Sequence, residues 1–273
     1  MPELPEVQTT VSGLLRLTGC KIKKTLVYNR SLRWPIIKNI ETCLENQTII
    51  NISRRAKYII VQLDVFHLVI HLGMTGKFTF SEKNIPLKKH DHVEFFFEGT
   101  DEILRYNDPR RFGSIHLLKK QDSLDDFFLF KKLGPEPLSE EFNHEYLYNK
   151  AKSHKQSVKA FVMNSSVVVG VGNIYASEAL FMSKILPSKA ANQLSKKKMI
   201  TLVDCIKKVL ELAIEKGGSS INDYFNTNGQ SGYFQIELSV YGRENLPCNI
   251  CKTLIKKITI GQRSSFFCSV CQR

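Results

Sequence analysis

Four cysteines near the end of the chain constrain its fold more than any other feature of the sequence. Cys248 and Cys251 form one Cys-x-x-Cys pair, and Cys268 and Cys271 form a second pair sixteen residues later. Each pair places two thiolates on one side of a tetrahedral ion, and four thiolates complete its coordination shell. The spacing predicts a hairpin between two knuckles that hold one structural zinc ion. A redox-active thiol pair is the alternative, which the presence of two matched pairs disfavours. Arg263 follows Gly261, so it is expected at the tip of the predicted hairpin, where a guanidinium can reach a phosphate; a solvated Arg on an exposed turn is the alternative.

The charge of the chain indicates the kind of partner it binds. Its 273 residues carry a formal net charge of +13, which favours a polyanion. Nucleic acid is the first candidate and an acidic membrane surface is the second. The sequence has no apolar run long enough to cross a bilayer and no basic-then-apolar signal pattern at its start. We therefore expect a cytoplasmic protein with reduced cysteines and no membrane partner.

The first six residues read Met-Pro-Glu-Leu-Pro-Glu, and apolar residues at helical spacing follow them. They predict a helix that starts at Leu4 and ends near Gly19. If Met1 is removed, Pro2 offers a secondary amine with a pKa near ~8, part of which is neutral and nucleophilic at pH 7. Such an amine can attack an aldehyde-like sugar carbon and form an iminium. Taken alone, these residues favour the simpler interpretation, a proline-rich lead-in to a helix cap.

Short runs of β-branched and aromatic residues follow the first helix. They predict an antiparallel β-sandwich packed with that helix, with strands at 56–63, 66–72, 77–80, 92–97, 102–106 and 114–118. Residues 98–101 are expected to form a hairpin turn. After a linker at 133–138 the periodicity becomes helical, at 140–151, 158–163, 174–184 and 195–216. We expect the glycines from 217 to end the last helix, and a β-type segment near 235–241.

Two further groups of residues suit contacts with a nucleic acid. In the Gly-Val-Gly-Asn run that ends at Asn173, the glycines allow a tight turn and Asn173 is expected to cap the next helix. Such a helix start favours phosphate, although a plain turn between helices is the simpler interpretation. Basic residues interleave with Met74 and Phe112 in loops between strands, which suits a surface that wedges apolar groups between bases. Core packing of Met74 and Phe112 is the alternative.

Five motifs occur in one order along the chain. They are the Pro-Glu start, Arg-Arg-Ala-Lys-Tyr at 54–58, Asn-Asp-Pro-Arg-Arg-Phe-Gly at 107–113, Gly-Val-Gly-Asn-Ile-Tyr at 170–175, and the four-cysteine finger. Together they closely resemble bacterial formamidopyrimidine-DNA glycosylases, which remove oxidised purines such as 8-oxoguanine. The resemblance spans the whole chain and implies an α+β multidomain fold. Its parts would be an N-terminal β-sandwich with a flanking helix (1–132), a helix–two-turn–helix domain (133–234) and a C-terminal zinc-finger hairpin (235–273).

The resemblance also implies a bifunctional glycosylase and AP lyase, with four catalytic residues. Pro2 would attack C1′ of the damaged nucleotide and displace the base, leaving a covalent imine. Glu3 would be the general acid and base. Lys57 would bind a phosphate beside the lesion and assist β-elimination. Arg263, on the finger, would hold phosphates and assist the δ-elimination that follows.

A second set of residues would contact the DNA around the extruded base. Met74, Arg110 and Phe112 would fill the gap that the base leaves, with Arg110 pairing to the orphaned cytosine. Residues 219–233 would form a loop over the flipped base. The DNA backbone would be contacted by His71, His90, Lys155, Asn173 and Tyr241. The implied partner is double-stranded DNA with oxidised purines, bound by a monomer in the nucleoid.

The sequence departs from the family pattern in places, because Gln8 stands where Glu is common and Ala160 where Pro is frequent. Relatives that prefer oxidised pyrimidines usually have Gly at position 4 and lack the gap-filling set. Leu4, Arg110 and Phe112 therefore favour the purine enzyme. Two alternatives stay open at this point: the same scaffold acting on oxidised pyrimidines, and a catalytically silent zinc protein that binds DNA.

Overall fold

The computed structural model describes residues 2–218 and 238–273. By its internal contacts the chain forms two compact units, one of Met1–Phe128 with Gly217–Gln235 and the other of Leu129–Lys216 with Ile236–Arg273. The predicted loop at 219–233 lies outside the described residues. Within the described part of the chain, no helix combines the length and the apolar character needed to cross a bilayer.

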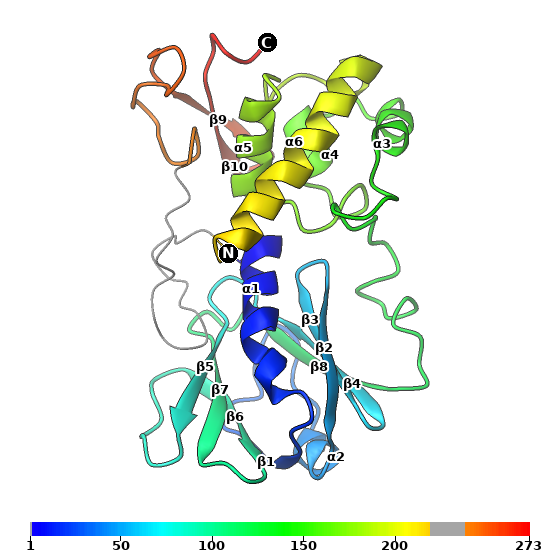
Figure 1. The fold of residues 1–273 in the computed structure, drawn as a ribbon, viewed down its shortest axis with the longest axis vertical. Coiled ribbons are helices and arrows are strands. Elements are labelled where there is room, and N and C mark those ends of the chain that lie inside the picture. The colour runs from blue at the N-terminus through cyan, green and yellow to red at the C-terminus, as the bar shows by residue number, and fades with distance from the viewer. Residues whose placement is uncertain (1, 219–237) are drawn as a thin grey trace. The chain divides into compact units, whose positions relative to one another are not determined.

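The first unit is a β-sandwich of two four-stranded antiparallel sheets (Figure 1). One sheet has the strand order β1-β6-β7-β5 and the other has the order β2-β3-β4-β8. The bounds of the first sheet are β1 Ile22–Val27, β5 Lys77–Glu82, β6 Asp91–Phe97 and β7 Glu102–Asn107. Those of the second are β2 Ile49–Arg55, β3 Tyr58–Leu63, β4 Phe66–His71 and β8 Ser114–Lys119. The predicted sandwich and the turn at 98–101 are confirmed.

Apolar side chains from both sheets and from the first helix share one core. Ile59 and Leu68 of one sheet and Phe78 of the other belong to the same buried cluster. Helix α1 (Leu4–Leu14) adds Val7 and Val11 to it. Each such side chain contributes about 1.5–3 kcal/mol when it is fully buried. The helix continues as the 3-10 turn η1 (Leu15–Leu17), so the predicted end near Gly19 is confirmed.

Two strands and a short helix of this unit escaped the sequence patterns. Strands β1 and β2 each contain a register shift, at Ile22/Lys24 and Ile49/Asn51, which interrupts the period-two alternation of apolar residues. Helix α2 (Ile40–Leu44) is too short to show a helical period. The strand predicted to begin at residue 56 begins two residues later, because Ala56 has φ 54 and belongs to a turn.

The second unit packs helices around a separate core and ends in a hairpin (Figure 1). Its elements are α3 His144–Ala151, α4 Val158–Val162, α5 Asn173–Met182, η2 Ala191–Gln193, α6 Lys196–Glu215, β9 Lys256–Ile260 and β10 Arg263–Phe267. The four predicted helices and the hairpin between the cysteine pairs are confirmed. Gly217, with φ 77, follows the end of α6 as expected.

The β-type segment predicted near 235–241 is wrong for the part that the structure describes, Leu238 to Tyr241, which forms bends and a turn. The carboxylate of Glu178 explains the difference. It accepts the backbone N–H groups of Ser239, Val240 and Tyr241 at 2.8, 3.0 and 2.8 Å. Three successive donors directed at one side chain are not available to a strand partner. The remaining residues, 235–237, lie outside the described part.

Candidate nucleic-acid interface and catalytic residues

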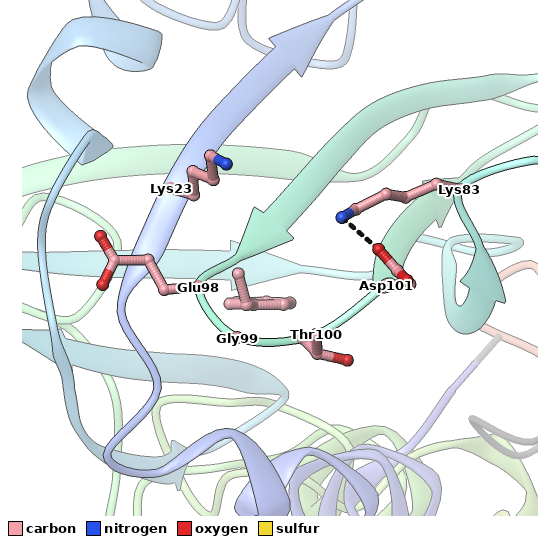
Figure 2. Close-up of a pocket in the computed structure, with 7 residues that line it drawn as sticks. Lys23, Lys83, Glu98, Gly99, Thr100 and Asp101 are labelled. Atoms are coloured by element: carbon pink, nitrogen blue, oxygen red, sulfur yellow. Dashed lines mark hydrogen bonds and ion pairs between the residues drawn. The ribbon is translucent and has the colours of Figure 1, made fainter.

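A surface pocket of the first unit lies at the turn between β6 and β7 (Figure 2). Lys83 and Asp101 form an ion pair across it, with 2.7 Å between Nζ and Oδ1. The other lining residues are Lys23, Phe97, Glu98, Gly99 and Thr100. None of the residues predicted to be catalytic or to contact DNA lines this pocket.

The N-terminal residues are held by the start of α1. Pro2 and Glu3 are buried, and Glu3 has the extended backbone of a helix N-cap. The Glu3 N–H donates to Oε2 of Glu6 at 2.8 Å, so Glu6 stabilises the first turn as its spacing suggests. Val7 and Val11 are buried in the core of the sandwich, which fixes the helix on it. Pro2 is therefore attached to a rigid element.

Lys57 lies in the tight turn between β2 and β3, and a polar relay joins this turn to α1. Arg54 donates from Nη1 to the carbonyl of Ala56 at 2.8 Å and from Nε to Oε1 of Gln8 at 3.0 Å. Gln8 belongs to the helix that carries Pro2 and Glu3 at its start. Here a neutral amide occupies the position where a Glu would form an ion pair with Arg54. The relay fixes the turn that bears Lys57 relative to the N-terminal helix.

His71 ends β4 and is held as a neutral hydrogen-bond donor. Its Nδ1 accepts the N–H of Gly73 at 3.1 Å, which leaves the proton on Nε2. Burial, followed by the positive charges of Lys57 and Arg33, lowers the pKa of His71 to about 4. Its ring lies 4.9 Å from the ring of Tyr58. Lys57 and Arg33 therefore place positive charge near the His71 ring.

The lowered pKa of His71 makes stability depend on pH. Because the pKa is 6.5 when unperturbed and about 4 in the folded protein, the unfolded chain binds more protons between these values. The neutral His71 ring therefore makes its full contribution to the free energy of unfolding above pH 6.5, and this contribution is lost as the pH falls from 6.5 through 4. Nearby Asp108 opposes the shift and His116 adds to it. With allowance for partial exposure, we expect a loss of about 2–3 kcal/mol in the free energy of unfolding.

Urea unfolding of the wild type and of His71→Gln at pH 7 and pH 4 measures this loss. The wild type should lose more stability than the variant over that interval. A difference between the two proteins that is the same at both pH values would contradict the assignment.

Met74, Arg110 and Phe112 come together on two adjoining loops of the first unit. The side chains of Met74 and Phe112 are 37% and 45% exposed, so neither is core packing. The guanidinium carbon of Arg110 lies 4.7 Å from the centre of the Phe112 ring. Gly73, with φ 63, brings the loops into backbone contact, because a Cβ there would lie 2.4 Å from the carbonyl carbon of Phe112. These exposed groups form a basic and apolar surface that we call the wedge.

His90 precedes β6 with a left-handed backbone (φ 74), which an ordinary strand residue does not adopt. Its carbonyl accepts the N–H of Asp108 at 3.1 Å, and its ring lies 6.4 Å from that of His92. The chain around His90 is thereby joined to the segment that leads to Arg110. Lys155, in the other unit, is exposed in the loop between α3 and α4.

In the second unit Arg263 lies beside the two-residue turn of the β9–β10 hairpin, as the sequence predicts. Gly261 and Gln262 have φ values of 54 and 60, the twist that favours such hairpins. Arg263 pairs with Ile260 and its side chain is exposed. The backbone carbonyl of the next residue, Ser264, is held by helix α4, because Nζ of buried Lys159 donates to it at 3.0 Å.

The expectation that Asn173 caps α5 is wrong. The cap is Gly172, and Asn173 is the first helical residue. Its Nδ2 donates to the carbonyl of Ser264 at 3.0 Å, so the side chain binds the finger hairpin instead of the helix N–H groups. Tyr241 also contacts the hairpin, with its ring 5.2 Å from that of Phe266. Both residues therefore adjoin the strand that Arg263 begins.

The four cysteines fit a zinc ion. Their sulfur atoms all lie within 4.8 Å of one another, with 3.9 Å between Cys248 and Cys271 and 3.4 Å between Cys251 and Cys268. Sulfur atoms about 2.3 Å from a tetrahedral zinc stand about 3.8 Å apart. Four thiolates would leave no open coordination position, so an ion held here is structural. It would hold the two knuckles from which the β9–β10 hairpin extends.

Three family matches cover most of the chain. They are the formamidopyrimidine-DNA glycosylase N-terminal domain over residues 1–115, the H2TH domain of the same enzymes over 133–224, and the zinc finger found in FPG and IleRS over 245–273. A formamidopyrimidine-DNA glycosylase of Hahella chejuensis is 45% identical and is matched over 100% of both chains. The chain belongs to the formamidopyrimidine-DNA glycosylase family. The predicted family, fold class and structural zinc are thereby confirmed.

Other members of the formamidopyrimidine-DNA glycosylase family show the same agreement. The enzyme of Pasteurella multocida is 45% identical over 100% of both chains. A structure of Lactococcus lactis Fpg with DNA containing an abasic site matches with a TM-score of 0.92 and 37% identity, over 99% of each chain. A mutant of the same enzyme with Fapy-dG DNA matches with a TM-score of 0.92 over 100% of both. The likeness thus extends over the full length of the fold.

Several residues that position the site in this family member were absent from the sequence predictions. Arg54 lies in a predicted motif, but nothing in the sequence indicates that it bonds Gln8. Glu178 is buried in α5 and orders the segment that carries Tyr241. Asp108 follows β7 and is fully buried. The only sign of Asp108 in the sequence is its place in the Asp-Pro-Arg-Arg run. Such a run suggests a surface loop equally well.

Proposed function

We propose that the protein is a base-excision-repair glycosylase that removes oxidised purines from double-stranded DNA and then nicks the strand as an AP lyase. The observation that carries this proposal is the full-length match to formamidopyrimidine-DNA glycosylases with Pro2, Glu3 and Lys57 in place. Structures of the Lactococcus lactis relative contain abasic-site and Fapy-dG DNA. The net charge of +13 suits the same polyanion.

The chemistry begins at the nitrogen of Pro2 after Met1 has been removed. The neutral amine attacks C1′ of the damaged nucleotide, the bond from C1′ to the base breaks, and the base leaves with the electron pair and takes a proton from water. The proline nitrogen gives its own proton to the Glu3 carboxylate. Glu3 donates a proton to the sugar ring oxygen, which opens the ring and leaves an iminium between Pro2 and C1′. Glu3 directly follows Pro2 in the chain and is buried at the start of α1.

The iminium then supports strand cleavage. It withdraws electrons from C2′, so that loss of a C2′ proton expels the 3′ phosphate, and a second elimination expels the 5′ phosphate. Lys57 and His71 bind the backbone beside the lesion. Arg263 binds phosphates from the finger hairpin and assists the second elimination.

The wedge fills the space that the extruded base leaves. Extrusion costs a few kcal/mol, which stacking by Phe112 and Met74 offsets. The guanidinium of Arg110 donates to the acceptor atoms on the pairing edge of cytosine, and its contact with the Phe112 ring restrains it for that role. The remaining backbone contacts come from His90, Lys155, Asn173 and Tyr241. The protein acts as a monomer on nucleoid DNA in the cytoplasm.

Borohydride trapping tests the proposal directly. Untagged protein is incubated with a duplex containing 8-oxoguanine opposite cytosine and then reduced, with an undamaged guanine:cytosine duplex as the control. We expect a covalent adduct on the damaged duplex alone, located at Pro2 by mass spectrometry. Without reduction, the nicked strand should carry 3′ and 5′ phosphate ends. Tight binding of the lesion without adduct or nick would instead identify a silent DNA-binding protein.

A second candidate function is removal of oxidised pyrimidines by the same residues. A structure of Lactococcus lactis Fpg with DNA containing an oxidised pyrimidine favours it, since that complex matches with a TM-score of 0.91 and 37% identity. The two are separated by single-turnover rates on 8-oxoguanine:cytosine and thymine-glycol duplexes. We expect the purine rate to be the higher one. A faster reaction on thymine glycol would mean that oxidised pyrimidines are the main substrate.

A further inference from the structure

A buried carboxylate lies beneath the wedge. Asp108 directly follows β7 and is 0% exposed. Its Oδ2 accepts the N–H of Gly113 at 2.8 Å and the hydroxyl of Tyr106 at 3.3 Å. Its Oδ1 accepts the hydroxyl of Thr75 at 2.6 Å. One carboxylate therefore binds both loops of the wedge, because Thr75 is adjacent to Met74 and Gly113 is adjacent to Phe112.

The hydroxyl of Thr75 also bonds the other loop directly. Its Oγ1 accepts the backbone N–H of Arg110 at 3.1 Å while it donates to Asp108. The result is a two-step relay in which Arg110 donates to Thr75 and Thr75 donates to Asp108. A hydroxyl is needed at the centre, because only a group that donates and accepts at once can connect a backbone N–H to a carboxylate.

The surroundings of Asp108 hold it in place. The carbonyl of Asp108 is 2.8 Å from Nε2 of buried His92, and it accepts the N–H of Arg111 at 3.1 Å. A side chain at position 113 is excluded, since a Cβ there would lie 1.8 Å from the Tyr106 hydroxyl. Asp108 is thus a fixed point to which both loops are attached.

We propose that Thr75 is a positioning residue whose hydroxyl locks the loop of Met74 and the loop of Arg110 and Phe112 together on Asp108, so that the wedge enters the duplex as one preformed unit. This inference rests on the proposed function, because it assigns a role in base extrusion. Side chains that are ordered before binding lose little conformational freedom when they replace the base. Without the hydroxyl, the two loops would have to be ordered during extrusion.

Two substitutions of Thr75 separate the effect of its hydroxyl from the effect of its side-chain shape. Thr75→Val keeps the branched shape and removes the relay, whereas Thr75→Ser keeps the relay. Both proteins are assayed under single turnover on an 8-oxoguanine:cytosine duplex and on a duplex with a preformed abasic site opposite cytosine. We expect Thr75→Val to lower the rate of base excision about 10-fold. The lyase rate should change less than about 2-fold, because an abasic site has no base to extrude.

Thr75→Ser should excise 8-oxoguanine at nearly the wild-type rate. Combining Thr75→Val with Phe112→Ala should cost little more than Phe112→Ala alone, because a positioning residue has no effect once the group it positions is absent. Thermal unfolding of each variant provides the measure of folding.

A purely structural role for Thr75 would lower the excision and lyase rates by the same factor and would make its effect additive with that of Phe112→Ala. That result would overturn the inference, as would wild-type excision by Thr75→Val. Failure of the proposed function is a different outcome, because the wild-type protein would then remove no 8-oxoguanine and nick no abasic site.

Discussion

A protein that retains Met1, or any other residue before Pro2, forms no adduct with lesion DNA and excises no base. Acylation converts the proline amine to an amide, whose nitrogen has no electron pair available to attack C1′. Removal of a catalytic nucleophile usually costs several orders of magnitude, so we expect base excision to fall at least ~10³-fold. The lyase activity should fall with it, because both reactions pass through the same iminium.

A cleavable N-terminal extension provides the experiment and its control in one preparation. Before cleavage, the protein should bind the lesion duplex but give no borohydride-trapped product. After cleavage to a free Pro2, confirmed by the mass of the intact protein, excision and trapping should both return. Full turnover by the extended protein would remove the proline amine from the mechanism.

Removal of zinc should abolish DNA binding. A hairpin held by four cysteines has a small core, and its ordered state depends on the metal. Among the residues that the structure describes, few apolar side chains, Val240 and Ile255 among them, are buried with the cysteines in this region. Loss of the hairpin would release Arg263 and the contacts of Asn173 and Tyr241 with it. We expect the dissociation constant for lesion DNA to rise on the order of 100-fold or more at fixed salt.

Fluorescence anisotropy before and after chelation measures this change, with zinc content determined in each sample. Cys268→Ser should reproduce the loss without a chelator. Cys20→Ser is the matched control, since Cys20 lies in the first unit and outside the cysteine cluster. Circular dichroism should show that the rest of the fold persists. Binding of equal strength by protein with no measurable zinc would contradict the expectation.

Much of the fold followed from local patterns. The spacing of the cysteines predicted the finger, and the glycine before Arg263 placed that residue at the hairpin turn. Helical spacing predicted α1 and α6, each of which buries one side along much of its length. Helix α5 is different, because it is buried on all sides from Ile174 to Phe181. Strands β1 and β2 were missed because their register shifts interrupt the alternation that marks a strand. A local pattern is readable only where the burial it reflects is regular.

The errors arose where a distant residue took a hydrogen bond that local reasoning assigned nearby. Asn173 was expected to cap its own helix and instead bonds the carbonyl of Ser264. The segment up to Tyr241 was expected to be β-type and instead donates its N–H groups to Glu178. Both partners are remote in sequence, so neither could be found from the residues beside them.

The sequence by itself determined the chemical groups: a proline next to a glutamate, basic and apolar residues in the loops, and four metal-binding thiols. Only the tertiary structure decided which residues hold these groups in place. Gln8 meets Arg54 across 46 positions, and Thr75 meets Asp108 across 33. Composition and spacing act along the chain, whereas hydrogen-bond partners of buried polar groups are selected by sheet register and loop packing. That selection exists only once the sandwich has formed.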